Sequence, residues 1–143
     1  MTTLSSETLH ASCIAIGGRA VLIEGLSGSG KSDLALRLID RGAVLVSDDY
    51  TIVRRNGDNV IASAPANIAG LIEVRGVGLV PMPAESDVTV ALIVRISDSI
   101  ERMPEGLETE VIAGVTIPRF CIAPLEASAP IKVEIMLKLK GLE

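Results

Sequence analysis

Short apolar runs alternate with polar turns along the first part of the chain and predict strands. Residues 13–16 and 20–23 are apolar and are separated by Gly17-Gly18. A glycine pair between two such runs is typical of a tight hairpin. The second run leads directly into a glycine-rich segment, so we expect this hairpin to deliver a strand to that segment.

The periodicity changes after Lys31 and predicts a helix. Apolar residues recur at helical spacing while most charged residues fall on the other side; the apolar positions are Leu34, Ala35, Leu38 and Ile39. Gly42 follows the last periodic residue, where glycine commonly ends a helix. Residues 44–46 then predict a short buried strand that ends at Ser47-Asp48-Asp49.

Further strands are expected in the middle of the chain. Residues 51–54 and 60–63 flank Asn56-Gly57, which predicts a second hairpin. Residues 71–74 form a short strand candidate, and residues 88–96 form the longest one.

The tail supports two interpretations. Residues 131–139 alternate between apolar and mostly polar residues, which favours a strand. Pro130 follows Ser128-Ala129, and proline in the first turn favours a helix. Both interpretations stay open from the sequence.

Composition fits one α/β domain over residues 1–143. The chain is long enough for a single sizeable core, and 48% of its residues are hydrophobic, with no Trp, one Tyr and one Phe. A core of Val, Ile, Leu and Ala suits strands covered on both faces. We therefore expect a mixed sheet with flanking helices.

Charge and hydropathy exclude several classes of protein. The net charge of −5 disfavours non-specific nucleic-acid binding, which needs a basic surface. No apolar stretch approaches the roughly 20 residues of a membrane span, and the first ten residues have no apolar signal core. We expect a cytoplasmic protein, in which Cys13 and Cys121 are small buried side chains rather than a disulfide.

One motif predicts a phosphate-binding loop, or P-loop. The spacing G-x-x-x-x-G-K-S is complete in Gly25-Leu26-Ser27-Gly28-Ser29-Gly30-Lys31-Ser32. Such a loop aims backbone N–H groups inward as an anion cradle, and the following helix points its positive end at the same place. Lys31 can reach the β- and γ-phosphates, and the Ser32 hydroxyl can ligate Mg²⁺. We expect the loop to bind a nucleoside triphosphate. The chain has no N-K-x-D pattern, which a GTPase would need to recognise its base.

Two acidic residues follow the next strand. In α/β sheets the carboxyl ends of strands face the ligand crevice, which is where Asp48 and Asp49 are expected. A carboxylate there can ligate Mg²⁺ through its water shell or accept the proton of an attacking hydroxyl. Either residue could take either role.

A third segment combines charge with glycine. Glu73-Val74-Arg75-Gly76-Val77-Gly78 places a carboxylate and a guanidinium next to a loop that can approach a ligand closely. Glu73 is a candidate second metal ligand. Arg75 is a candidate for steadying phosphate charge.

These three segments, in this order, resemble HPr kinase/phosphorylase, the bacterial enzyme that acts on a serine of the phosphocarrier protein HPr. The resemblance spans roughly residues 8–130. Within the family, the chain most resembles the short proteobacterial form, which consists of the catalytic domain alone. It implies the fold type shared with phosphoenolpyruvate carboxykinase, the use of ATP and Mg²⁺, HPr as substrate, and a hexamer.

The resemblance also implies roles for single residues. His10 matches the family's catalytic histidine, and Lys31 would bind phosphate. Asp49, or its neighbour Asp48, would be the base that deprotonates the substrate serine. Ser32 and Glu73 would hold Mg²⁺. Arg102 would match a catalytic arginine.

One departure from the family pattern concerns the reverse reaction. Longer members carry a P-x-R-P-G-R-N-like segment associated with dephosphorylation, and the comparable residues 117–128 lack its Pro-Gly-Arg-Asn core. The kinase direction is therefore the better supported one. The alternative is a nucleotide-binding regulatory module that has lost catalysis and senses phosphocarrier status by binding alone.

Overall fold

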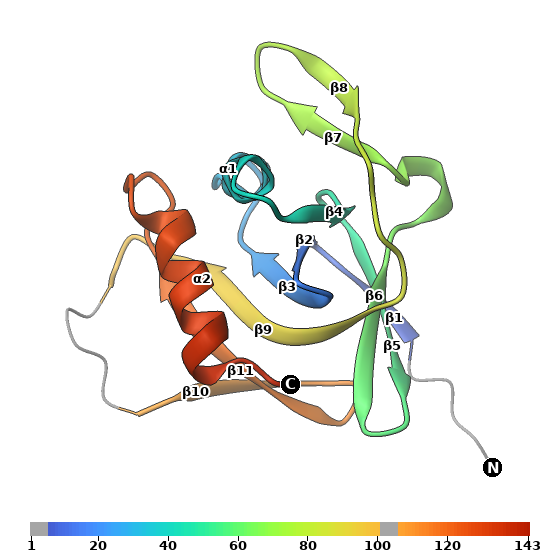
Figure 1. Ribbon diagram of the computed structural model, residues 1–143, viewed down its shortest axis with the longest axis vertical. Coiled ribbons are helices and arrows are strands. Elements are labelled where there is room, and N and C mark those ends of the chain that lie inside the picture. Colours follow the sequence, from blue (N-terminus) through green and yellow to red (C-terminus); the bar gives the residue numbers. More distant parts are fainter. Residues whose placement is uncertain (1–5, 101–105) are drawn as a thin grey trace.

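The computed structural model describes residues 6–100 and 106–143, where a curled sheet carries two helices and a separate hairpin (Figure 1). The main sheet contains β1 (Ser6–Leu9), β2 (Ala11–Ile16), β3 (Arg19–Glu24), β4 (Val44–Ser47), β5 (Thr51–Asn56), β6 (Asn59–Ser63), β9 (Val88–Ile96), β10 (Glu108–Ile112) and β11 (Val115–Ile122). The remaining elements are α1 (Lys31–Asp40), α2 (Ala129–Lys140), the 3₁₀ turn η1 (Ala66–Ile68) and the hairpin of β7 (Leu71–Val74) and β8 (Gly78–Pro81).

The sheet is mixed, as expected from the sequence. Its order is β1-β5-β6-β9-β3-β2-β4, and β11 joins the end of β9 while pairing with β10. β3 is antiparallel to β2 and parallel to β9, and β4 is antiparallel to β2. β3, β4 and β9 therefore run in the same direction, which brings their carboxyl ends to one edge of the sheet.

Two apolar cores cover the two faces of the sheet. Alternate residues of β3 point to opposite faces, as the strand period of two requires. Val21 and Ile23 pack with α1 and α2, and Ala20 and Leu22 pack with the curled half of the sheet. Figure 1 shows α1 and α2 over one face of the sheet, with the β7–β8 hairpin projecting beyond α1.

The predicted helix after Lys31 is confirmed and ends as glycine chemistry requires. α1 buries Leu34, Ala35 and Leu38. Gly42 has φ +110°, and its N–H donates to Ile39 O. The Ala43 N–H donates to Leu38 O, which completes a Schellman motif. The Schellman motif therefore fixes the carboxyl end of α1 just before β4.

The tail is a helix, so the strand interpretation of residues 131–139 is wrong. α2 buries Ala129, Val133 and Leu137 on one face. Three other apolar residues of the helix, Ile131, Ile135 and Leu139, are exposed. Apolar residues on both faces of a helix produce the alternation that a strand would also show.

Both predicted hairpins and the strand candidates at 44–46, 71–74 and 88–96 are confirmed. β1, β8, β10 and β11 were not expected. Both cysteines are free, Cys13 buried and Cys121 partly buried, and burial raises the pKa of the Cys13 thiol. Within residues 6–100 and 106–143, no helix has the length and apolar character needed to cross a membrane.

Candidate active site

The predicted P-loop connects β3 to α1 at the carboxyl edge of the sheet. Gly30 has φ +107°, a conformation that glycine adopts readily, and it directly precedes the helix. A Cβ atom added to Gly25 would lie 2.5 Å from Ser29 Oγ and 3.3 Å from Ile96 Cβ. A side chain at position 25 would therefore require the Ser29 side chain to turn away and Ile96, at the end of β9, to shift.

Lys31 is buried beneath this loop. Its Nζ atom donates to Gly25 O at 3.0 Å and to Leu26 O at 3.1 Å. The side chain is only 4% exposed, and the nearest carboxylate is that of Asp49, at 3.7 Å. The ammonium is thus held at the loop by two carbonyl oxygens, and its third N–H faces His10 Nε2 at 3.5 Å and Asp49 Oδ1 at 3.7 Å.

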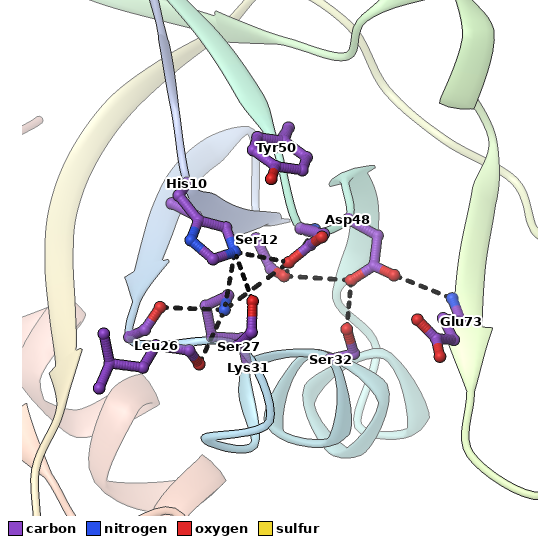
Figure 2. A network of polar contacts seen from close by, with 12 residues as sticks. His10, Ser12, Leu26, Ser27, Lys31, Ser32, Asp48, Tyr50 and Glu73 are labelled. Atoms are coloured by element: carbon purple, nitrogen blue, oxygen red, sulfur yellow. Dashed lines mark hydrogen bonds and ion pairs between the residues drawn. The ribbon is translucent and has the colours of Figure 1, made fainter.

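Asp48 is buried, and both of its carboxylate oxygens accept hydrogen bonds (Figure 2). Its Oδ1 accepts from Ser32 Oγ at 2.6 Å and from Ser12 Oγ at 3.1 Å, and its Oδ2 accepts from the Glu73 N–H at 2.9 Å. Three donors hold this carboxylate in place. Asp48 therefore joins α1, β2, β4 and β7 into one site.

Asp49 adopts a backbone conformation that is unusual for a residue other than glycine. Its φ is +66°, and the Tyr50 N–H donates to Asp48 O across it at 2.7 Å, which defines a γ-turn. The Asp49 N–H donates to Ser12 Oγ at 3.0 Å. Strained backbone of this kind concentrates at functional sites. The turn directs the half-exposed Asp49 side chain towards Lys31 and His10.

His10 lies opposite Asp49, in the bend between β1 and β2. Its Nε2 lies 3.0 Å from Asp49 Oδ1, 3.5 Å from Lys31 Nζ and 3.5 Å from Ser27 Oγ. Its ring stacks on Tyr50, with 5.0 Å between the ring centroids. The imidazole is therefore oriented on one side by an aromatic ring and on the other by the carboxylate.

The structure brings most of the predicted site residues together. Arg75 is not among them, and Arg102 cannot be placed. Figure 2 shows the Glu73 side chain beside Asp48. Arg75 lies exposed in the turn between β7 and β8, and none of the polar contacts described above involves it. Arg102 lies outside the described residues. Sequence reasoning missed Ser12, although a lone hydroxyl within the apolar strand 11–16 was a signal for it.

The donors at the site fit Mg²⁺. Ser32 Oγ and the carboxylates of Asp48 and Glu73 are hard oxygen ligands of the type that Mg²⁺ takes. In residues 6–100 and 106–143, no three His, Cys, Asp or Glu side chains converge as a metal cage. Mg²⁺ bound together with phosphates needs no such cage, because phosphate oxygens and waters fill the remaining positions.

An open pocket adjoins the loop on the His10 side. It has a volume of about 400 Å³ and is lined by Leu9, His10, Glu24, Gly25, Leu26, Arg95 and Ile96. Burial, together with the carboxyl group of Glu110, raises the pKa of Glu24 to about 7, although Arg95 and Arg119 act in the opposite direction. The pocket thus places an arginine and a carboxyl group beside apolar side chains.

Comparisons with known proteins agree with this geometry. The family model of the HPr serine kinase C-terminal domain matches residues 2–136. A Lacticaseibacillus casei (strain BL23) protein named HPr kinase/phosphorylase is 30% identical over 129 residues, which are 81% of this chain and 40% of that protein. A Chlorobium luteolum protein of the same name is 37% identical over 126 residues, covering 78% of this chain and 38% of that protein.

A solved structure supports the same relationship. The Hpr(Ser) kinase/phosphatase from Coxiella burnetii superposes with a TM-score of 0.80 at 28% identity, covering 92% of this chain and 94% of that one. The chain spans only about 40% of the length of the curated relatives. The fold and family expected from the motifs are therefore confirmed: the chain belongs to the HPr serine kinase C-terminal domain family.

Proposed function

We propose that this chain is an ATP-dependent protein-serine kinase that phosphorylates the phosphocarrier protein HPr. The P-loop, Gly25 to Ser32, would cradle the phosphates, with Lys31 on the β- and γ-phosphates. Asp49 would take the proton of the acceptor serine as the serine oxygen bonds to the γ-phosphorus and the bond to the β-phosphate oxygen breaks. ADP and phosphoserine are the products.

The observation that carries this proposal is the position of the Asp49 carboxylate. It lies 3.7 Å from Lys31 Nζ and 3.0 Å from His10 Nε2, it is half exposed, and a γ-turn holds it there. A general base must reach the proton that it removes. Asp48 meets this requirement poorly, because it is 6% exposed and three donors occupy its carboxylate. These contrasts favour Asp49 as the base.

Ser32 and Glu73 would hold Mg²⁺, which would neutralise charge on the transferring phosphoryl group when it is bound. Lys31 would share this task with one arginine, either Arg75 or Arg102. His10 would orient the Asp49 carboxylate towards the acceptor, since its Nε2 is the closest polar atom to Asp49 Oδ1 among the described contacts.

The forward direction is the one we propose. Arg119, in the segment that lacks the Pro-Gly-Arg-Asn core, donates to Glu108 and Glu110 on β10, each at 3.2 Å. This guanidinium is therefore committed to the neighbouring strand. The alternative, a nucleotide-binding module without catalysis, rests on the same altered segment.

The test is incubation of the protein with Mg²⁺, labelled ATP and HPr. The kinase proposal expects phosphoserine on HPr, none on an HPr variant whose acceptor serine is replaced by alanine, and little loss of label when inorganic phosphate is added afterwards. Nucleotide binding without any phosphoserine would support the regulatory module instead.

Three further parts of the proposal are that residues 1–143 form one domain, that the chain assembles into a hexamer, and that it acts in the cytoplasm. The family model, which matches residues 2–136, supports the first. Light scattering coupled to size-exclusion chromatography measures the second. Fractionation of cells that produce the protein tests the third.

A further inference from the structure

The pocket beside the P-loop includes four residues that have no role in the mechanism above, namely Leu9, Glu24, Arg95 and Ile96. It shares His10, Gly25 and Leu26 with the catalytic groups, because Lys31 Nζ donates to Gly25 O and Leu26 O while His10 faces Asp49. From there it extends to Leu9 and to the end of β9, at Arg95 and Ile96. The pocket is therefore continuous with the proposed catalytic site and extends from it towards the end of β9.

The geometry of the reaction brings the acceptor chain to this pocket. The serine hydroxyl must lie within about 3 Å of the Asp49 carboxylate for proton transfer. Each residue of an extended chain advances by about 3.3 Å, and successive side chains point to opposite sides. A residue adjacent to the serine thus falls within reach of the pocket wall that His10 forms.

The chemistry of the lining fits a polypeptide segment. Leu26 is 82% exposed, which leaves an apolar surface uncovered at the mouth of the site. Arg95 is half exposed, and its only described polar contact is an ion pair of 3.8 Å with Glu24 Oε1. Its guanidinium therefore has N–H donors free for a carboxylate or carbonyl oxygen. Glu24, only 17% exposed, holds the arginine at the pocket.

We propose that this pocket is the acceptor subsite: it holds the residue next to the phosphorylated serine, with an apolar portion against Leu26 and Ile96 and an oxygen atom bound by Arg95. The inference rests on the proposed kinase function and adds a specificity-determining residue to it. The oxygen belongs either to an acidic side chain or to the substrate backbone, and both share the same chemistry towards Arg95.

The experiment compares R95A and R95K with the wild type in HPr phosphorylation. A matched control is R54A, because Arg54 is similarly exposed, loses the same charge and pairs with Asp87 at 3.1 Å on another part of the surface. Loss of a charge-assisted hydrogen bond is expected to raise KM for HPr about tenfold in R95A, and less in R95K, with KM for ATP within about twofold of wild type. R54A should leave both KM values unchanged.

An unchanged KM for HPr in R95A overturns the acceptor subsite. A rise in KM for ATP instead of HPr also overturns it, and would show that the pocket binds the nucleotide. Thermal melting of each variant shows that it is folded. Failure of the wild type to phosphorylate HPr would sink the proposed function separately.

In that event a library of serine peptides, randomised beside the serine, decides the inference. A preference beside the serine that R95A loses supports the subsite, and its acidic or neutral character tells a side-chain carboxylate from a backbone carbonyl. No preference, or no phosphorylated peptide, overturns it.

Discussion

Replacing Asp49 by glycine, alanine and asparagine separates the backbone role of this residue from its chemistry. The left-handed φ of +66° costs an alanine about 1–2 kcal/mol. Glycine adopts this conformation freely but loses about 0.5–1 kcal/mol through its greater freedom in the unfolded chain. D49G is therefore expected to be more stable than D49A by about 0.5–1 kcal/mol, or about 2–3 °C in Tm for a chain of this size.

The comparison between D49G and D49A is robust because both lose the same contacts with His10 and Lys31, so those terms cancel. Phosphotransfer to HPr should fall by about 10²–10⁴ in both variants and in D49N, as expected for loss of a general base. Calorimetry and a phosphotransfer assay measure the two effects. Equal stability of D49G and D49A would refute the strain argument, and near-wild-type activity in D49N would refute the assignment of the base.

Three other substitutions test separate parts of the site. S32A should raise the Mg²⁺ concentration needed for half-maximal ATP binding about tenfold, through loss of one oxygen ligand, as titration calorimetry can measure. G25A should weaken ATP binding and lower stability by about 1–3 kcal/mol, because its Cβ would lie 2.5 Å from Ser29 Oγ and 3.3 Å from Ile96 Cβ, so both neighbours must move; unchanged values would contradict the close packing. E24Q should flatten the pH dependence of Tm. Glu24 keeps its proton up to a pKa of about 7 in the folded protein, whereas its ordinary pKa is 4.5. The stability of the wild type therefore falls as the pH rises between these two values, and the stability of E24Q should not show this fall.

The parts of the fold that sequence predicted correctly depend on local chemistry. The P-loop, α1 and the glycine that ends it, Gly42, are contiguous in the sequence. The need for glycine at these positions can be recognised from the neighbouring residues alone. The same holds for the two hairpins. Asp48 and Asp49 could be placed at the loop because parallel strands bring their carboxyl ends together. These features needed no knowledge of distant contacts.

Long-range contacts account for what the sequence did not reveal. β1 is polar and exists as a strand because it pairs with β5, 42 or more residues away along the chain. β11 contains Pro118, which cannot donate to a ladder; it lies opposite Thr109 of β10, and the parallel pairing with β9 begins only at Arg119. Ser12 can donate to Asp48 only because β2 pairs with β4, and this pairing is not visible in the sequence.

The difference between Asp48 and Asp49 was also hidden in the sequence. Both residues follow the same strand and have the same side chain. Burial, three donors and the γ-turn distinguish them in the structure. Neighbouring identical residues can thus take different roles when tertiary contacts occupy one of them.

The most direct test of the central claim is a single-turnover reaction of excess protein, with Mg·ATP, on HPr, followed by intact mass spectrometry of HPr. We predict that wild-type protein adds one phosphoryl group to the acceptor serine, and that D49N binds ATP with similar affinity but adds none in the same time. HPr that remains unmodified by folded, ATP-bound wild-type protein would contradict it.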